Sequence, residues 1–201
     1  FAASLGQREI QARFAERAAH WRNLFNLETS FVQPKRQGAW IQGFDPREVN
    51  FNYTEANGWQ YAFAMQHDVG THKALMGGDS AYLAHLEGLF TAPIQTTGRV
   101  QPDITGLIGQ YAHGNEPSHH VSYLAAYAGQ PGSNAERVRN ICDSFYSNAP
   151  DGLCGNEDCG QMSAWYVWSA LGMYPVTPAS GELVLGTPRF KRTVVTPAQG
   201  G

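Results

Sequence analysis

Residues 152–166 read GLCGNEDCGQMSAWY, and this stretch decides how the rest of the chain is interpreted. Its first part is a polar loop with three glycines, which allow sharp turns and left-handed backbone. From Gln161 onward the sequence is apolar on nearly every side, which predicts a buried helix. A polar loop fixed to such a helix can display reactive side chains from a rigid scaffold. Glu157 and Asp158 in this loop could equally cap the helix, because acidic residues are favoured at helix N-termini.

The composition indicates a globular chain with a packed core. It has 201 residues, 42% of them hydrophobic and 12% aromatic, which suits one domain or slightly more. The formal net charge of −3 gives no electrostatic reason to expect nucleic acid or an anionic membrane as a partner. No apolar run reaches the roughly 18 residues that a membrane span requires. The chain shows no signal peptide and begins with Phe1 rather than Met, so we expect a fragment or a mature form.

The three cysteines are an odd number, so at least one is free or paired outside the chain. Cys154 and Cys159 are close enough in sequence to bridge around the glycine loop, and they could equally be two reduced thiols. Without a second cysteine pair, a structural zinc site is not favoured.

Apolar spacing predicts a largely helical chain with long connections. A first helix carries Ile10, Phe14, Ala18 and Trp21 and ends near Asn26. Further helices are expected after a cap at Thr54 or Asn57, over Ser80–Phe90, over Ser118–Ala128 before Gly129, and over Asn134–Tyr146. Residues 181–186 and 192–197 are typical of short strands. Because helical bundles usually have short connections, pairs of helices arranged in a toroid fit this pattern better.

Polar side chains gather in three clusters, each just before a predicted buried helix. They are Glu55, Asn57, Trp59 and Gln60 with His67 and Asp68; His113, Asn115, Glu116, His119 and His120; and Asn156, Glu157, Asp158 and Gln161. Each cluster alone is more simply explained by helix capping or by satisfied core histidines. Together, carboxylates, amides and aromatic rings are typical of a sugar-cleaving pocket. Their oxygen donors also suit Ca²⁺, although a calcium-binding loop of the EF-hand type and the HExxH and GxSxG motifs are absent.

Five segments together resemble a known family. They read RAAHWRNLF at 17–25, YTEANGWQY at 53–61, HGNEPSHH at 113–120, GNEDCGQMSAWY at 155–166 and SALGMYPV at 169–176. In this order they resemble the catalytic domain of glycoside hydrolase family 92, whose members are secreted, calcium-dependent exo-α-mannosidases. The resemblance implies an all-α fold that is part of an (α/α)6 toroid or barrel with short β-strands at the C-terminal end. It places residues 1–175 in the barrel and residues 176–201 at the start of a C-terminal β segment. The family's N-terminal β-sandwich is absent from this chain.

The resemblance also implies an activity, a cofactor and site residues. The expected reaction removes terminal α-linked mannose from glycans, including N-glycans, by an inverting mechanism, with Glu55 as the general acid and Asp158 as the general base. Calcium would be held near Asn115 and Glu116. Substrate contacts are expected from Trp59, His67, Asp68, His119, His120, Asn156 and Glu157. By this resemblance the protein is secreted, periplasmic or on the cell surface, and its partner is a mannose-containing glycan.

The sequence departs from the pattern of the family at three places. Asn156 stands where many members have Asp, which leaves one carboxylate fewer around the attacking water. Residues 56–58 read Ala-Asn-Gly where Gly-Asn-Ala is usual, and Met65-Gln66 replaces Val-Pro before the retained histidine and aspartate. These changes leave both expected catalytic carboxylates in place.

Two other interpretations remain open. One is a calcium-dependent carbohydrate-binding fragment without turnover, against which the presence of both Glu55 and Asp158 argues. The other is a different (α/α)-barrel glycosidase, which would share paired carboxylates but not the motifs quoted above. A purely structural helical domain explains least, because it has no need of polar clusters before buried helices.

Overall fold

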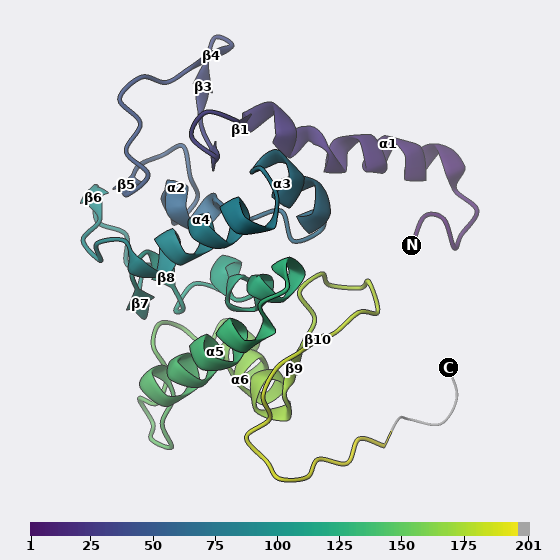
Figure 1. Cartoon of the computed structure of the whole chain (residues 1–201), viewed down its shortest axis with the longest axis vertical. Coiled ribbons are helices and arrows are strands. Elements are labelled where there is room, and N and C mark those ends of the chain that lie inside the picture. The colour runs from purple at the N-terminus through teal and green to yellow at the C-terminus, as the bar shows by residue number, and fades with distance from the viewer. Residues whose placement is uncertain (197–201) are drawn as a thin grey trace. The chain divides into compact units, whose positions relative to one another are not determined.

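The computed structural model describes residues 1–196 and divides the chain into two compact units (Figure 1). The first unit comprises Phe1–Pro102 and Gly109–Tyr111, and the second comprises Asp103–Ile108 and the residues from Ala112 onward. Each unit is described by itself below. Among residues 1–196, no helix combines the length and apolar character needed to cross a membrane.

The helices of the first unit are α1 (Arg8–Ala18), a 3-10 helix (His20–Leu24), α2 (Gly58–Tyr61), α3 (Val69–Leu75) and α4 (Asp79–Thr91). Its aromatic core lies between α3, α4 and the turns that follow α2. Phe63 after α2, Tyr82 and Leu86 of α4 are almost fully buried, since no more than 1% of each is exposed. By contrast, α1 buries none of its residues, and Ile10 and Phe14 are 45% and 49% exposed. The helical spacing of these two residues is confirmed, but they do not contribute to the core of this unit.

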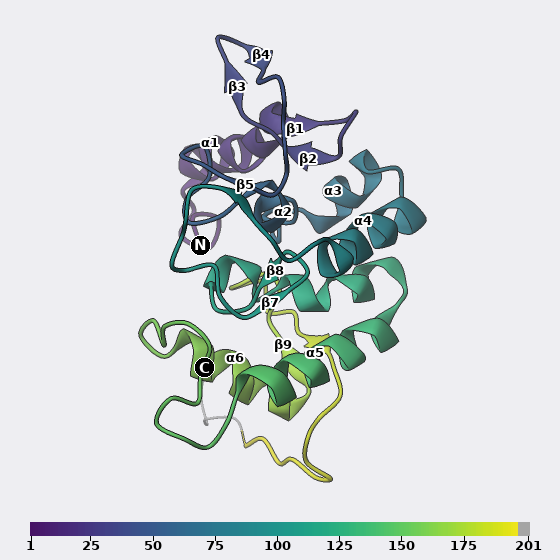
Figure 2. The same cartoon turned by 90° about the vertical axis from the view of Figure 1, so that its left-hand side faces the viewer.

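The strands of the first unit are two residues long and pair in twos. β1 (Phe25–Asn26) pairs with β2 (Phe31–Val32), and β3 (Lys35–Arg36) pairs with β4 (Ala39–Trp40), both antiparallel. The second pair is the hairpin that projects from this unit in Figure 2, and its turn has positive φ at Gln37 and Gly38. β5 (Glu48–Val49) pairs in parallel with β6 (Thr97–Gly98). This pairing joins the two ends of the segment that carries α2, α3 and α4.

The second unit is built on two helices and a long 3-10 segment. The short 3-10 helix Glu116–Ser118 precedes the 3-10 segment Val121–Ala128, which ends at Gly129 in the left-handed conformation. α5 (Pro131–Phe145) packs against Val121–Ala128 and against α6 (Gln161–Leu171), as Figure 2 shows. β9 (Met173–Tyr174) follows α6 and pairs with β10 (Val184–Leu185). Strands β7 (Leu107–Ile108) and β8 (Tyr111–Ala112) lie where the chain passes between the units.

The predicted helices are largely confirmed, with four differences. The segment predicted over Ser118–Ala128 is buried as expected, but from Val121 it winds as a 3-10 helix rather than an α-helix. α2 ends at Tyr61, so Phe63 and Met65 are buried in the turns after it. α3 was not predicted, because its Val-Gly-Thr-His sequence lacks a clear apolar period. α5 begins at Pro131, three residues before the predicted start at Asn134, and the missing N–H of a proline costs nothing at this first position.

The expected fold class is confirmed in its coarser part. Helices dominate and short strands are present, but neither unit by itself forms a closed barrel. The strands are distributed through the described chain as five two-stranded sheets rather than confined to its C-terminal end. A strand is found at Val184–Leu185, whereas residues 192–196 form none and residues 197–201 lie outside the described part. The domain boundary expected after residue 175 stays a prediction, and the β9–β10 pair spans it.

Candidate functional site

Glu55 and Asp158 share an unusual backbone conformation. Residues 1–196 contain six non-glycine residues with positive φ, and Glu55 (φ 55°) and Asp158 (φ 50°) are two of them. Left-handed backbone is uncommon outside glycine and concentrates at functional sites. Both side chains are exposed, and each lies just before a helix, α2 or α6. Since one belongs to each unit, the separation of their carboxyl groups stays a prediction.

A buried network of amides holds the loop that carries Glu55. Asn57 caps α2 by accepting from the Gln60 backbone N–H at 3.2 Å, and the Gln60 side chain accepts from the Asn57 N–H at 2.9 Å. Gln110 then fixes both residues: its Oε1 accepts from Asn57 Nδ2 at 2.8 Å, and its backbone carbonyl accepts from Gln60 Nε2 at 3.1 Å. Gln110 itself is fully buried and donates to the Pro93 carbonyl at 2.6 Å. The cap predicted at Asn57 is therefore confirmed, and it is anchored from a distant part of the chain.

Trp59, one of the residues expected to contact substrate, is half-buried and packs against other aromatic rings. Trp59 meets Phe31 with ring centroids 4.8 Å apart and His85 at 5.2 Å, and its indole also lies against Gly88. A role for Trp59 in binding sugar stays a prediction.

His67 and Asp68 connect the start of α3 to the end of α1 and to the 3-10 helix His20–Leu24. The Asp68 carboxylate accepts from Arg22 Nη2 at 2.7 Å and from Trp21 Nε1 at 3.4 Å, and His67 Nε2 lies 2.9 Å from the Ala18 carbonyl oxygen. Burial raises the pKa of Asp68, but the hydrogen bonds and charge from Arg22 and its neighbours outweigh it and hold that pKa below its usual value. These contacts give both residues a structural function, and their expected contact with substrate stays a prediction.

In the second unit, the loop that carries Asp158 packs closely against Gly106 and against Gly114 of the HGNEPSHH motif. A Cβ on Gly155 would lie 2.6 Å from the Gly114 carbonyl oxygen, and one on Gly106 would lie 2.5 Å from Cys154 Sγ. Both glycines also have positive φ, so any larger residue would displace the loop. Cys154 and Cys159 are both free thiols, and burial raises the pKa of Cys154 to about 11.

Glu157 and Asp158 have different functions in this loop. The Glu157 carboxylate accepts from the Ser163 backbone N–H at 3.0 Å and from Ser163 Oγ at 2.9 Å. Because Ser163 lies in the first turn of α6, Glu157 caps that helix, as its acidic character allowed. Asp158 is left exposed beside the cap with its backbone in the left-handed region. The expected contact of Glu157 and the exposed Asn156 with substrate stays a prediction.

Buried histidines connect the start of α6 to the HGNEPSHH motif. His119 Nε2 donates to the His113 carbonyl at 3.0 Å, so its Nδ1 is unprotonated and accepts from Gln161 Nε2 at 3.2 Å. His113 Nε2 lies 2.6 Å from the hydroxyl of Tyr146, which donates to the Met162 carbonyl at 3.2 Å. Burial lowers the pKa of His119 to about 4, which keeps the ring neutral. The network therefore ties the first turn of α6 to the HGNEPSHH motif.

The residues expected to hold calcium lie in the same motif. Asn115 is buried and precedes the 3-10 helix that begins at Glu116, whose side chain is half-buried. His120 is buried beside them in sequence. Amide and carboxylate oxygens are the donors that Ca²⁺ prefers, so the chemistry of this pair fits the ion. Residues 1–196 hold no group of three or more His, Cys, Asp or Glu arranged for a metal. Because Ca²⁺ takes about six to eight oxygen ligands, Asn115 and Glu116 can supply only part of its coordination.

Sequence reasoning missed several residues that shape these loops. Gln110, Tyr146 and Ser163 make the hydrogen bonds described above, and His72 and His85 pack in the aromatic core of the first unit. Only Gln110 carried a signal, since it is a lone amide inside an apolar stretch. Tyr146, His72 and His85 act through contacts with residues far away in the chain, whereas Ser163 binds Glu157 six positions before it.

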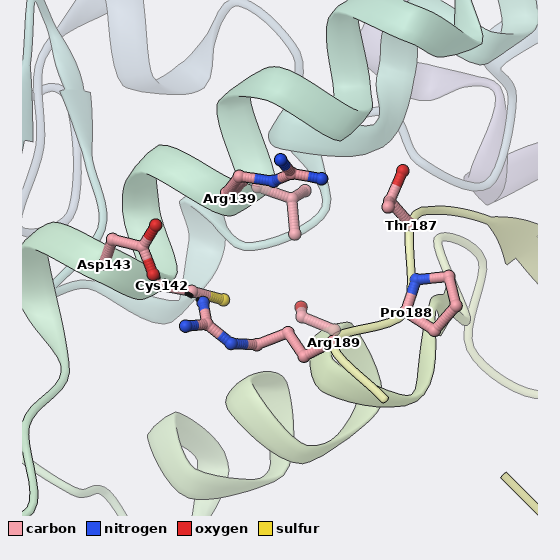
Figure 3. A pocket seen from close by; sticks show the side chains of 8 residues that line it. Arg139, Cys142, Asp143, Thr187, Pro188 and Arg189 are labelled. Carbon is pink, nitrogen blue, oxygen red and sulfur yellow. Dashed lines mark hydrogen bonds and ion pairs between the residues drawn. The ribbon is translucent and has the colours of Figure 1, made fainter. Parts of the chain in front are cut away.

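The second unit also has a charged cavity of about 240 Å³, shown in Figure 3. It lies between α5 and the segment around Pro188, with Arg139, Asp143 and Cys142 on one side and Thr187 and Arg189 on the other. Arg189 Nη1 donates to Asp143 Oδ1 at 2.6 Å, which neutralises two of its three charges. None of the predicted site residues lines this cavity.

Comparisons with known proteins agree with this picture. The model of the glycosyl hydrolase family 92 catalytic domain matches residues 1–201. An uncharacterized secreted glycosidase of Arthroderma benhamiae is 27% identical over 204 residues, which cover 89% of this chain and 24% of that protein.

Two solved structures from Bacteroides thetaiotaomicron are similar in fold as well as sequence. A family GH92 α-mannosidase is 37% identical with a TM-score of 0.82, over 93% of this chain and 24% of that one. A family GH92 inverting mannosidase is 37% identical with a TM-score of 0.78, over 94% of this chain and 27% of that one. The chain thus spans about a quarter of the length of these relatives. With a family model that covers its whole length and neighbours of the same family, this chain belongs to glycosyl hydrolase family 92.

Proposed function

We propose that the complete polypeptide carrying this chain is a glycoside hydrolase that removes terminal α-linked mannose from glycans. The observation that carries the proposal is the pair of exposed, left-handed carboxylate residues, Glu55 and Asp158, in a chain of this family. Each is presented just before a helix whose side-chain cap is made by a neighbour, Asn57 or Glu157. Two structural neighbours are described as mannosidases, which supports the same substrate class.

The proposed mechanism is inverting and uses the two carboxyl groups in different roles. Glu55 donates a proton to the oxygen of the leaving group, and Asp158 takes a proton from a water on the opposite face of the sugar ring. This requires a separation of about 6.5–9.5 Å between the carboxyl groups, which leaves room for the water. The neutral His119 orients Gln161 one turn beyond Asp158, and the cap by Glu157 fixes the loop between them.

Calcium is part of the proposal, with Asn115 and Glu116 as the residues of this chain that would hold it. When bound, the ion would orient two adjacent hydroxyl groups of the mannose through their oxygens. Secretion or exposure on the cell surface is proposed as well, supported by the match to a secreted glycosidase.

The test is hydrolysis by the complete polypeptide of an aryl α-mannoside and of α-1,2-, α-1,3- and α-1,6-mannobiose. We expect release of mannose whose initial anomer, observed by proton NMR, is β, and loss of activity after EGTA that added Ca²⁺ restores. An α product contradicts the inverting mechanism. Full activity in a sample stripped of metal, verified by elemental analysis, contradicts the calcium proposal. Binding of mannosides without any hydrolysis would favour a carbohydrate-binding protein instead.

A further inference from the structure

A second cavity of the second unit, of about 520 Å³, lies beside the Asp158 loop. One wall is the loop from Tyr146 to Leu153, whose ends pair with each other. The other wall is the outward face of α6, where Ser163, Tyr166 and Val167 lie three and four residues apart. Its volume is within the range of about 300–1,000 Å³ that small-molecule sites occupy.

The lining of this cavity is uncharged and includes two aromatic rings. The rings of Tyr146 and Tyr166 meet at 4.9 Å with their planes tilted by 38°. The Tyr146 hydroxyl is used in the interior, where it donates to the Met162 carbonyl, so this ring is fixed. Tyr166 is half-buried, and its hydroxyl makes no hydrogen bond within residues 1–196. Asn148, which is exposed, adds an amide at the rim.

Ser163 connects this cavity to the proposed catalytic loop. Its side chain lines the cavity, and its Oγ donates to the carboxylate of Glu157 at 2.9 Å. Glu157 directly precedes Asp158, the proposed base. A group held in the cavity is therefore close to the loop at which the glycosidic bond would be cleaved.

We propose that this cavity is a second carbohydrate site, which holds a further neutral sugar residue of the glycan chain. A sugar ring has apolar C–H faces and a rim of hydroxyl groups, so it needs an aromatic wall with a few neutral donors and acceptors. The lining offers these groups in Tyr166, Asn148 and Ser163 and has no charged side chain. An anionic ligand would be better served by the arginine-lined cavity of Figure 3. The assignment to a mannose-containing glycan rests on the proposed function.

The test measures equilibrium binding to the complete polypeptide with Asp158→Asn, which prevents turnover. The ligands are methyl α-mannoside, linear manno-oligosaccharides and gluco-oligosaccharides, and binding is followed by calorimetry and saturation-transfer NMR. On this background, Tyr166→Ala and Asn148→Ala remove the proposed contacts, and Tyr166→Phe keeps the ring. Tyr127→Ala is the matched control, because Tyr127 is a half-buried tyrosine of the same unit that lines another cavity.

We expect Tyr166→Ala to raise the Kd of the manno-oligosaccharides about tenfold, a loss on the order of one aromatic contact. Tyr166→Phe and Asn148→Ala should raise it less, and the Kd of methyl α-mannoside should stay unchanged in all variants. Tyr127→Ala should change neither. The proposal is overturned if none of the oligosaccharides binds, or if Tyr166→Ala and Asn148→Ala both leave their Kd unchanged.

The outcome for this site is independent of the outcome for the proposed activity. If the protein with native Asp158 hydrolyses no α-mannoside, yet binding of a manno- or gluco-oligosaccharide still depends on Tyr166, the activity proposal fails and the carbohydrate site stands. If hydrolysis of aryl α-mannoside is normal and Tyr166→Ala leaves KM for the oligosaccharides unchanged, the activity stands and the carbohydrate site fails. Circular dichroism of each variant verifies that the helices are intact.

Discussion

Gln110 should control the order of the loop that presents Glu55, and Gln110→Met tests this most directly. Methionine has nearly the same volume and shape, so it removes polar atoms without opening a cavity. It leaves the buried Asn57 Nδ2, bonded at 2.8 Å, without its best partner, and it removes the donor of the 2.6 Å bond to the carbonyl of Pro93, which is an exposed residue. An unsatisfied buried group costs about 1–3 kcal/mol, and a lost hydrogen bond about 0.5–1.5 kcal/mol. Asn57 retains only a 3.3 Å contact to the Arg47 carbonyl. We therefore expect local destabilisation of about 3 kcal/mol.

The assay is amide hydrogen exchange of the complete polypeptide followed by mass spectrometry. The reporting amide is that of Gln60, which donates to the Asn57 side chain and exchanges when the cap opens. A loss of about 3 kcal/mol corresponds to an increase of roughly 100-fold in its exchange rate. Peptides from α6 in the second unit serve as the internal control and should not change.

A double-mutant cycle separates this network from independent effects. Asn57→Ala removes the cap and should cost about 1–2 kcal/mol by itself. Because Asn57 and Gln110 share one hydrogen bond, the double variant should lose about 1 kcal/mol less than the sum of the single losses. Unchanged protection of residues 57–60 in Gln110→Met, or strict additivity in the cycle, would refute the reasoning.

Three further predictions concern the carboxylates and one buried histidine. Glu55→Gln should slow hydrolysis of a mannobiose strongly but that of a dinitrophenyl mannoside little, because this leaving group departs without protonation. Asp158→Asn should slow hydrolysis of both substrates, since the water still needs a base. The same comparison of leaving groups for Glu116→Gln decides whether Glu116 is the acid instead. Glu157→Ala should destabilise α6 by about 1 kcal/mol through loss of its cap, measured by exchange of α6 amides, with Glu157→Gln closer to the native protein. Burial, together with the neighbouring His85, lowers the pKa of His72 to about 3. The unfolded state then binds more protons, so stability should be full above about pH 6.5 and fall as the pH drops towards about 3, less so in His72→Leu.

Each of these predictions has an outcome that contradicts it. Leaving-group rescue in Glu116→Gln but not in Glu55→Gln reverses the assignment of the acid. If the α6 amides exchange equally fast in Glu157→Ala and in the native protein, Glu157 does not cap α6. Stability between pH 6.5 and 4 is measured by chemical denaturation. If it falls by the same amount in His72→Leu and in the native protein, His72 is not the source of the loss.

Local sequence was sufficient to predict the caps of α2 and α6. The Asn57–Gln60 box and the acidic residue before α6 act within six residues of their partners, so their chemistry can be read from spacing alone. Apolar periodicity likewise located α4, α5 and α6. The same spacing could not show that the apolar residues of α1 are exposed, because burial depends on what packs against a helix.

The order of the motifs was sufficient to identify the family. The segments around Glu55, Asn115 and Asp158 identified it, and the family model confirmed it over residues 1–201. The chemical types of the side chains also indicated which carboxylates and amides are candidate site residues. General acid–base catalysis and calcium binding each restrict the side chains that can take part. Sequence could not separate Glu157, which caps α6, from Asp158, which stays exposed, since both are acidic neighbours in one loop.

Only the tertiary structure decided which distant residues hold these loops. Gln110 binds Asn57 across 53 positions, and Gln161 binds His119 across 42. Such pairs leave no local pattern, because a buried amide must find whichever partner the fold brings within hydrogen-bonding distance. The cavity beside α6 arises in the same way, since its aromatic wall is shared between a helix face and a loop that meet only after folding. The sequence alone determined the chemical groups and the helices that carry them, and packing determined which of those groups face one another.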